Sequence, residues 1–130
     1  MIADTDVLID LMQARESAVE AIRTLEGANV PIRISAMSLF ELYHGLERIE
    51  NPSKRRRRMQ SVLDTREVYP AGEGVMKKAG RLDGQLAGLG ETIGIGDTII
   101  AATGLLHEEP VLTRNVRHFS RIDGLDIETF

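Results

Sequence analysis

Short apolar runs alternate along this chain with longer stretches in which apolar residues recur every three or four positions. Apolar runs bounded by turn residues are typical of buried strands, whereas the longer repeat is typical of amphipathic helices. Strands are therefore expected at residues 1–4, 32–34, 67–69, 110–113 and 125–129. Helices are expected near residues 6–11, 17–26, 38–49, 53–64, 73–89 and 97–107, with a short turn at 115–120. Alternating strands and helices predict βαβ units around a mainly parallel sheet of four to five strands, which is an α/β fold.

The longest expected helix, residues 73–89, carries a glycine in each of three successive turns. Gly80, Gly84 and Gly88 lie beside a seam of apolar residues. Each glycine costs about 1 kcal/mol relative to alanine in a helix interior. Two interpretations follow: a neighbouring helix or subunit approaches this stripe closely, or the helix is loosely held and mobile.

Composition limits the class of protein. The 130 residues include 42% hydrophobic and only 4% aromatic residues, which suits one domain, residues 1–130, with an aliphatic core. The chain has no cysteine, so disulfides, zinc–thiolate sites and thiol nucleophiles are excluded. Neither a signal peptide nor an apolar run of the ~18 residues that span a bilayer is found, so a cytoplasmic location without membrane contact is expected. Because the net charge is −4, a nucleic-acid substrate would have to be held by a local patch and a metal.

Acidic residues stand at the expected strand and helix ends, far apart in the chain. Asp4 and Asp6 flank Thr5 after the first strand, Glu41 lies in the helix after the second, and Asp97 opens the helix before the fourth. Right-handed connections bring the ends of parallel strands to one edge of the sheet, where ligands bind. Two carboxylates about 4 Å apart repel each other by roughly 4 kcal/mol at an effective dielectric near 20. Either their pKa values rise or a hard divalent cation neutralises them.

Each acid also has a purely structural interpretation. Asp4 or Asp6 could cap the first helix. Ser38 and Glu41 have the spacing of a capping box, and Asp97 stands at an expected helix start. Capping does not require Glu41 to share an edge with Asp4 and Asp97, whereas a metal site does. The joint pattern therefore favours a metal site over capping.

The ordered set of motifs resembles the PIN-domain nucleases and, within them, the VapC toxins of the VapBC toxin–antitoxin systems. The set comprises Asp4-Thr5-Asp6, Glu41 in a serine-rich helix start, Asp97 before Ile100-Ala101-Ala102, and Thr113-x-Asn115-x-x-x-Phe119. The resemblance covers essentially the whole chain. It implies a three-layer α/β/α PIN-like fold.

The same resemblance implies the chemistry of the site. Asp4, Glu41 and Asp97 are the implied ligands of Mg²⁺ or Mn²⁺, with Asp6 at a supporting position of the metal site. Thr113 is likewise implied to support the site or its water. Asn115 stands where many relatives carry aspartate; an amide oxygen can still coordinate but adds no charge, so one or two metals remain open.

The implied activity is endonucleolytic hydrolysis of an RNA phosphodiester by metal-activated water, leaving a 5′-phosphate and a 3′-hydroxyl. The implied partners are a VapB-like antitoxin whose tail covers the cleft, and a second copy of the chain in a homodimer or hetero-oligomer. A non-catalytic PIN-like module that binds RNA or protein is the alternative, and Asn115 is a step in that direction. A phospho-acceptor receiver is disfavoured, because no acceptor aspartate follows the third strand and no lysine follows Lys78.

Basic residues and histidines supply further candidates. Arg114 and Arg117 flank Asn115 and are the expected phosphate contacts in the cleft. The densest positive run, 54–58, could be a solvated helix face, an RNA contact or a contact to an acidic antitoxin segment. The histidines, His44, His107 and His118, are separated in sequence and are expected mainly as surface or packing residues, with substrate contact as the alternative for His118 because it is close to Asn115.

Overall fold

A computed structural model describes all 130 residues and contains one five-stranded sheet in the order β3-β2-β1-β4-β5. Every neighbouring pair in the sheet is parallel. The strands are β1 (Ile2–Ala3), β2 (Arg33–Ser35), β3 (Val68–Tyr69), β4 (Val111–Leu112) and β5 (Ile127–Glu128). The helices are α1 (Thr5–Met12), α2 (Glu16–Gly27), α3 (Ala36–Glu47), α4 (Ser53–Leu63), α5 (Glu73–Gly88), α6 (Ile95–His107) and α7 (Val116–Phe119). The predicted parallel α/β architecture is confirmed, and the expected turn at 115–120 contains the short helix α7.

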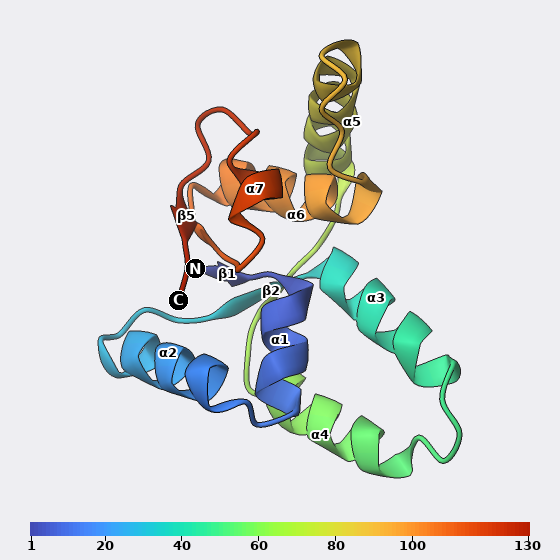
Figure 1. The fold of residues 1–130 in the computed structure, drawn as a ribbon, viewed down its shortest axis with the longest axis vertical. Helices are drawn as coiled ribbons and strands as arrows, with labels where there is room; N and C mark the ends of the chain where they lie inside the picture. The colour runs from blue at the N-terminus through green and yellow to red at the C-terminus, as the bar shows by residue number, and fades with distance from the viewer.

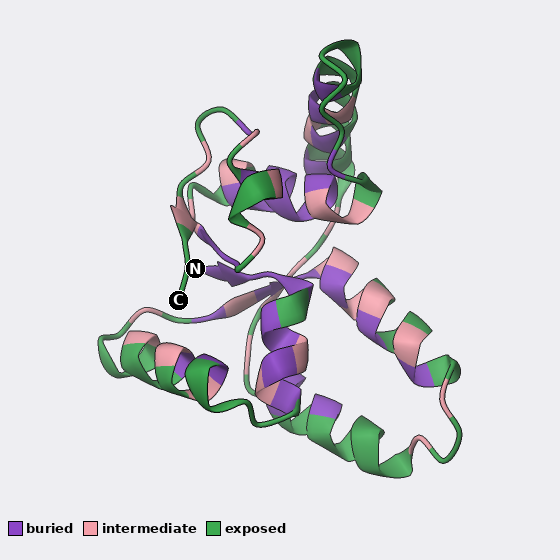
Figure 2. Ribbon diagram, viewed as in Figure 1, coloured by how far each residue is buried: buried purple, intermediate pink, exposed green.

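The helices cover the two faces of the sheet in chain order, which gives three layers. Helices α1–α4 lie on one side of the strands and α5–α7 on the other (Figure 1). Adjacent strand residues point to opposite faces, because side chains alternate along a strand. Ala3 belongs to the core under α1–α4, whereas Ile2 belongs to the core under α5–α7. Figure 2 shows the buried residues on the strands and on the helix sides that face them.

The direction in which the chain adds strands reverses at β1. From β1 the chain proceeds to β2 and β3 at one side, then returns to β4 and β5 at the other. Such a reversal opens a crevice at the carboxyl ends of the central strands. Asp4 follows β1 and Thr113 follows β4, so both residues lie at this crevice. No helix combines the length and the apolar character that crossing a bilayer requires.

The structure rules out two of the alternative capping interpretations. The residue that caps α3 is Ser35, whose side chain accepts a hydrogen bond from the Met37 amide. Ser38 therefore lies inside the helix and forms no capping box with Glu41. Helix α6 has Gly94 at its N-cap position, so Asp97 lies within the first turn. Both acids are thus free of the structural role that the sequence allowed.

The first helix begins at Thr5, two residues earlier than the interpretation of Asp6 as a cap requires. Asp4 occupies the N-cap position of α1, but its side chain makes no capping hydrogen bond. Asp6 lies in the first turn and is exposed. Neither carboxylate is explained by capping.

Glu109, which precedes β4, joins the starts of β1 and β2 to the side chain of Tyr69 in β3. Its carboxylate accepts hydrogen bonds from the amino group of Met1 at 2.5 Å, from Arg33 at 3.2 Å and from the hydroxyl of Tyr69. The Tyr69 ring also stacks on His107. Burial raises the pKa of Glu109, but the bonds from the amino group and Tyr69, with the charge of Arg33, outweigh burial and hold that pKa below its ordinary value. This cluster fixes the sheet at the end opposite to the crevice.

The glycine stripe of α5 faces open space. Helix α5 packs against α6 through buried residues that include Val75 and Leu82. A Cβ atom added at Gly80, Gly84 or Gly88 would meet nothing within 4 Å. No element of the same chain approaches the stripe closely, so a neighbouring helix of this chain does not explain it.

Replacing Gly84 by alanine should therefore raise the free energy of unfolding by about 1 kcal/mol, because alanine loses less backbone entropy in a helix. Urea unfolding followed by circular dichroism measures this change. A matched replacement at Gly94, where φ is +97°, should destabilise the protein instead. If Gly84→Ala loses stability only at high protein concentration, a second subunit packs on the stripe.

Candidate functional site

Asp4, Asp97 and the segment after β4 are joined by a continuous line of contacts. Thr113 donates a hydrogen bond from its hydroxyl to Oδ2 of Asp4 at 2.8 Å. The backbone amide of Asn115 donates to the same hydroxyl oxygen at 2.9 Å. The side-chain amide of Asn115 lies 3.4 Å from Oδ2 of Asp97. The carboxyl ends of β1 and β4 and the first turn of α6 are thus held together at the crevice.

Glu41 reaches the same place from the middle of α3. The Thr5 hydroxyl donates to Oε1 of Glu41 at 2.9 Å and lies 2.8 Å from the hydroxyl of Ser38. Gly96 has no side chain, and a Cβ atom there would lie 3.3 Å from Oε1 of Glu41. The carboxylate of Glu41 therefore rests against the first turn of α6, beside Asp97. Three acids from three separate elements share one edge of the sheet.

Burial and neighbouring carboxylates raise the pKa values of Asp4 and Glu41. Burial raises the pKa of Asp4 to about 6, with further contributions from the charges of Asp97 and Asp6, although the hydrogen bond from Thr113 opposes the shift. Burial also raises the pKa of Glu41, and the charges of Asp97 and Asp6 act in the same direction. Asp4 is 3% exposed, so water screens its charge little. The site therefore holds more negative charge than the protein around it stabilises.

No lysine or arginine forms an ion pair with any of these three carboxylates. Oxygen donors with uncompensated negative charge are what a hard divalent cation requires. The donors stand apart, since no three His, Cys, Asp or Glu side chains are gathered closely enough to hold an ion together. Mg²⁺ commonly keeps several waters and takes only one or two carboxylates. The residues thus fit such an ion by chemistry and charge without forming a closed cage.

His118 belongs to the site, although its sequence position favoured a surface or packing role. Its Nδ1 atom lies 3.1 Å from Oδ2 of Asp97 and 2.9 Å from the side-chain nitrogen of Asn115. A ring nitrogen either donates to the carboxylate or accepts from the amide, so the tautomer decides between these bonds. Asn115 begins a short helix, and a residue three positions later lies on the same side. That spacing was the available signal for His118.

Thr5 and Ser38 are two further residues whose role the sequence did not reveal. Both are buried, and their hydroxyls form a line that ends on Glu41. Thr5 has one proton to donate, so Ser38 donates to Thr5 while Thr5 donates to Glu41. This arrangement fixes the carboxylate of Glu41.

Thr5→Val should cost about 1–2 kcal/mol of unfolding free energy, because valine keeps the shape but leaves buried polar partners unbonded. Thr5→Ser keeps the hydroxyl and should cost clearly less. Denaturant unfolding of the two variants at neutral pH makes the comparison. Equal losses would mean that the methyl group of Thr5, not its hydroxyl, matters.

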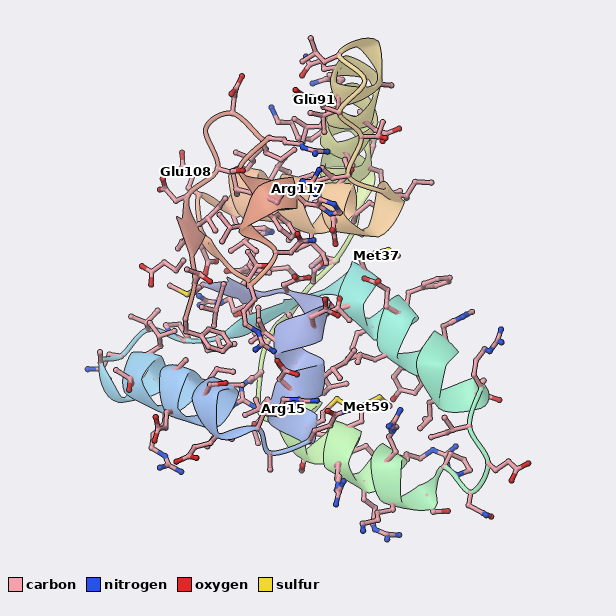
Figure 3. All side chains as sticks on the ribbon, viewed as in Figure 1. Arg15, Met37, Met59, Glu91, Glu108 and Arg117 are labelled. Carbon is pink, nitrogen blue, oxygen red and sulfur yellow. The ribbon has the colours of Figure 1, made fainter.

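The remaining candidate residues lie at the edge of the site. Asp6 makes no hydrogen bond, but its charge acts on Asp4 and Glu41. Arg114 forms an ion pair with Asp10 and lies over the ring of Phe130, 5.5 Å from its centroid. The Arg117 side chain is exposed on α7 (Figure 3) and makes no ion pair. Arg114 is thus already paired within the chain, whereas Arg117 is free.

Comparisons with known proteins agree with this fold. Residues 1–125 match the family model described as PIN domain. Ribonuclease VapC1 of Rickettsia felis is 30% identical over 99% of this chain and 95% of its own length. Ribonuclease VapC10 of Mycobacterium tuberculosis is 31% identical over 96% of this chain and 90% of its own.

Solved structures are similar over almost the whole chain. DNA-bound VapBC from Salmonella typhimurium matches with a TM-score of 0.88 and 25% identity, covering 98% of this chain and 96% of the other. VapBC2 from Rickettsia felis, bound to a DNA fragment from its promoter, matches with a TM-score of 0.90, covering 99% of this chain and 97% of the other. Its identity of 22% supports the fold alone.

Proposed function

The chain belongs to the PIN-domain family and, within it, to the VapC ribonucleases, and we propose that it is a metal-dependent endoribonuclease that serves as the toxin of a toxin–antitoxin pair. The resemblance drawn from the ordered motifs is thereby confirmed at the level of the family. The observation that carries the proposal is the convergence of Asp4, Glu41 and Asp97, unpaired with any lysine or arginine, at one edge of the sheet.

Asp4, Glu41 and Asp97 would hold Mg²⁺ or Mn²⁺, in part through waters that the ion keeps, with Asp6 adding negative charge at the edge. The cation, when bound, would supply a more acidic water and positive charge at the phosphate. Its positive charge would also offset the burial and the repulsion that raise the pKa values of Asp4 and Glu41. Asn115 is neutral, so the site offers a second cation less negative charge than it would with an aspartate at that position.

The other residues orient these ligands. Thr113 donates to Asp4 and leaves the second oxygen of that carboxylate, Oδ1, free of this bond. Thr5 does the same for Glu41, whose Oε2 remains available. Asn115 and His118 compete for contact with Asp97, so they set the direction of its carboxylate. Arg117 is exposed beside them and is proposed to contact a phosphate of the substrate, together with Arg114 if the pair with Asp10 opens.

The proposed partners follow from the family. Several similar solved structures are VapBC complexes, so a VapB-like antitoxin is the proposed inhibitor of this chain. A homodimer or a toxin–antitoxin hetero-oligomer is the proposed assembly. Exposed apolar side chains on α3, Phe40 and Tyr43, are available for such contacts.

Purified protein should cleave single-stranded RNA with Mn²⁺ or Mg²⁺ and stop when EDTA is added, with activity restored by excess metal. The expected products carry a 5′-phosphate and a 3′-hydroxyl, which end-labelling before and after phosphatase treatment distinguishes from cyclic phosphate ends. Cleavage that persists in EDTA, or 2′,3′-cyclic ends, would contradict the proposal. RNA binding without cleavage in any divalent metal would instead favour the non-catalytic module.

In cells, expression should arrest growth, and co-expression of a VapB-like antitoxin should relieve the arrest. A catalytically disabled variant is the control for an effect of expression alone.

A further inference from the structure

A pocket lies between α1, α3 and α4, and Glu41 of the candidate site forms part of its wall. Helices α3 and α4 extend as two arms from a connecting loop (Figure 1), and Met59 lies where α4 meets α1 (Figure 3). The pocket is half apolar, with Leu42 and Met59 in its lining, and it also contains Arg55 and Arg58. The basic run at residues 54–58 therefore lies near the candidate site.

The structure divides that run into two faces of α4. Arg55 and Arg58 are three residues apart and lie beside Met59, which is 1% exposed, so all three share one side of the helix. The other members of the run, Lys54, Arg56 and Arg57, do not line the pocket. A ligand that binds in the pocket would contact Arg55 and Arg58 only. Nonspecific electrostatic attraction would involve the basic residues of both faces.

Neither Arg55 nor Arg58 has a partner in the chain. Both side chains are exposed, and no carboxylate lies within ion-pair distance of either one, Glu41 included. Neither guanidinium makes a hydrogen bond to another group of the protein. Two arginines that share a pocket wall with a carboxylate, yet do not bond it, have all their donors free for an external anion.

The proposed substrate creates a need for such cations. RNA is a polyanion, and the site presents four carboxylates in a protein of net charge −4. An RNA strand that binds at Glu41 therefore needs positive groups nearby to offset this repulsion. Arg114 already forms an ion pair with Asp10. Arg55 and Arg58 are unpaired and line the same pocket as Glu41.

We propose that Arg55 and Arg58 bind backbone phosphates of the RNA strand next to the phosphate that is cut. This assignment rests on the proposed nuclease function of the site. The apolar part of the pocket gives a base or ribose a surface to pack on, while the two guanidinium groups hold the charged backbone. An acidic protein segment would also suit the arginines; RNA is favoured because the adjoining carboxylate site is the one proposed to cut it, and its phosphates complement the two unpaired guanidinium groups.

The test measures binding of a fluorescently labelled oligouridylate about 16 nucleotides long, the upper site size of a small single-strand-binding domain. Anisotropy titrations in EDTA, over a series of salt concentrations, exclude cleavage. Arg55→Gln/Arg58→Gln should weaken binding about tenfold and lower the slope of log K against log salt by about 1.4, the value for two phosphates on a single strand. The matched control Arg56→Gln/Arg57→Gln removes the same charge from the other face and should change both quantities little.

Equal weakening in the two double variants would overturn the proposal, because charge alone would then account for binding. A labelled oligoglutamate peptide supplies the second arm. If Arg55→Gln/Arg58→Gln loses the peptide but keeps the RNA, the surface binds an acidic protein segment and the proposal is wrong. Unfolding midpoints equal to that of the unmodified chain show that either variant is folded.

Cleavage assays separate this inference from the proposed function. If the unmodified chain cleaves RNA in Mn²⁺ and Arg55→Gln/Arg58→Gln has the kcat/KM of the control, the phosphate contact is wrong and the nuclease stands. If no variant cleaves RNA but the differential binding is found, the nuclease proposal fails and the RNA contact stands. A rise in KM with nearly unchanged kcat in Arg55→Gln/Arg58→Gln is the expected result, because the contact lies beside the reacting phosphate.

Discussion

Replacing Asp4 and Asp97 together by asparagine should lower RNA cleavage by about a thousandfold or more while the protein stays folded. Loss of the cation would remove several kcal/mol of transition-state stabilisation, and each 1.36 kcal/mol is a factor of ten in rate. Asparagine has nearly the size of aspartate and can still accept the hydrogen bond that Thr113 donates to Asp4. Single-turnover cleavage of a labelled RNA in Mn²⁺ measures the loss.

Stability measurements of the same double variant distinguish a lost metal site from a damaged fold. Because burial and the neighbouring acids raise the pKa of Asp4 to about 6, its ionised form destabilises the metal-free protein above that pH. The variant should therefore be at least as stable as the unmodified chain at pH 7.5 without metal. Mn²⁺ should raise the melting temperature of the unmodified chain and hardly move that of the variant.

The matched control is Asp64→Asn/Asp123→Asn, which removes the same charge from two exposed positions. It should keep both cleavage and the Mn²⁺ shift. Equal Mn²⁺ shifts in the site variant and in the unmodified chain would show that Asp4 and Asp97 do not bind the ion.

The largest expected effect on stability is at the other end of the sheet, at Glu109. Glu109→Gln should lower the free energy of unfolding by about 3 kcal/mol at pH 7, because it leaves a buried amino group and Arg33 without their common carboxylate. Glu67→Gln is the matched control: Glu67 also pairs with Arg33, but its side chain is 62% exposed and should contribute less than about 1 kcal/mol. Urea unfolding at constant ionic strength measures both.

The effect of Glu109→Gln should depend on pH in a defined direction. The folded-state pKa of Glu109 lies below its unfolded value of 4.5, so its carboxylate stabilises the fold fully above that value. The difference between the unmodified chain and Glu109→Gln should shrink as the pH falls through the folded-state pKa. A difference that stays constant from pH 7 to acid would show that packing, not charge, makes Glu109 important.

Local patterns were sufficient to predict most elements of the fold. The apolar runs at Ile34 and Val111 mark buried strands, and the helical repeat through Val75 and Leu82 marks α5, because burial of a strand or a helix face imposes its own period. Exact helix starts were less accessible. The spacing of Ser38 and Glu41 allowed a cap at Ser38, but the backbone path after β2 places the cap at Ser35.

The candidate acids could be named from the sequence, but their surroundings could not. His118 was only a minor candidate, through its closeness to Asn115, because its partner Asp97 is 21 residues away and the pairing depends on how α7 packs beside α6. Arg114 looked like a phosphate contact because it adjoins Asn115, yet its side chain turns to Asp10 on α1. Neighbours in sequence on a loop often point in different directions, so proximity along the chain did not indicate shared function.

Residue type, order and local period were enough to predict the parallel α/β architecture, the family and the three candidate acids. Which charges are paired and which remain free depends on how the helices pack on the sheet. This packing directed Arg114 to Asp10, left Arg55 and Arg58 unpaired beside Glu41, and aligned Thr5 and Ser38 behind that carboxylate. The physical reason is that electrostatic and hydrogen-bond energies depend on distances between side chains, and those distances are set only when the helices pack on the sheet.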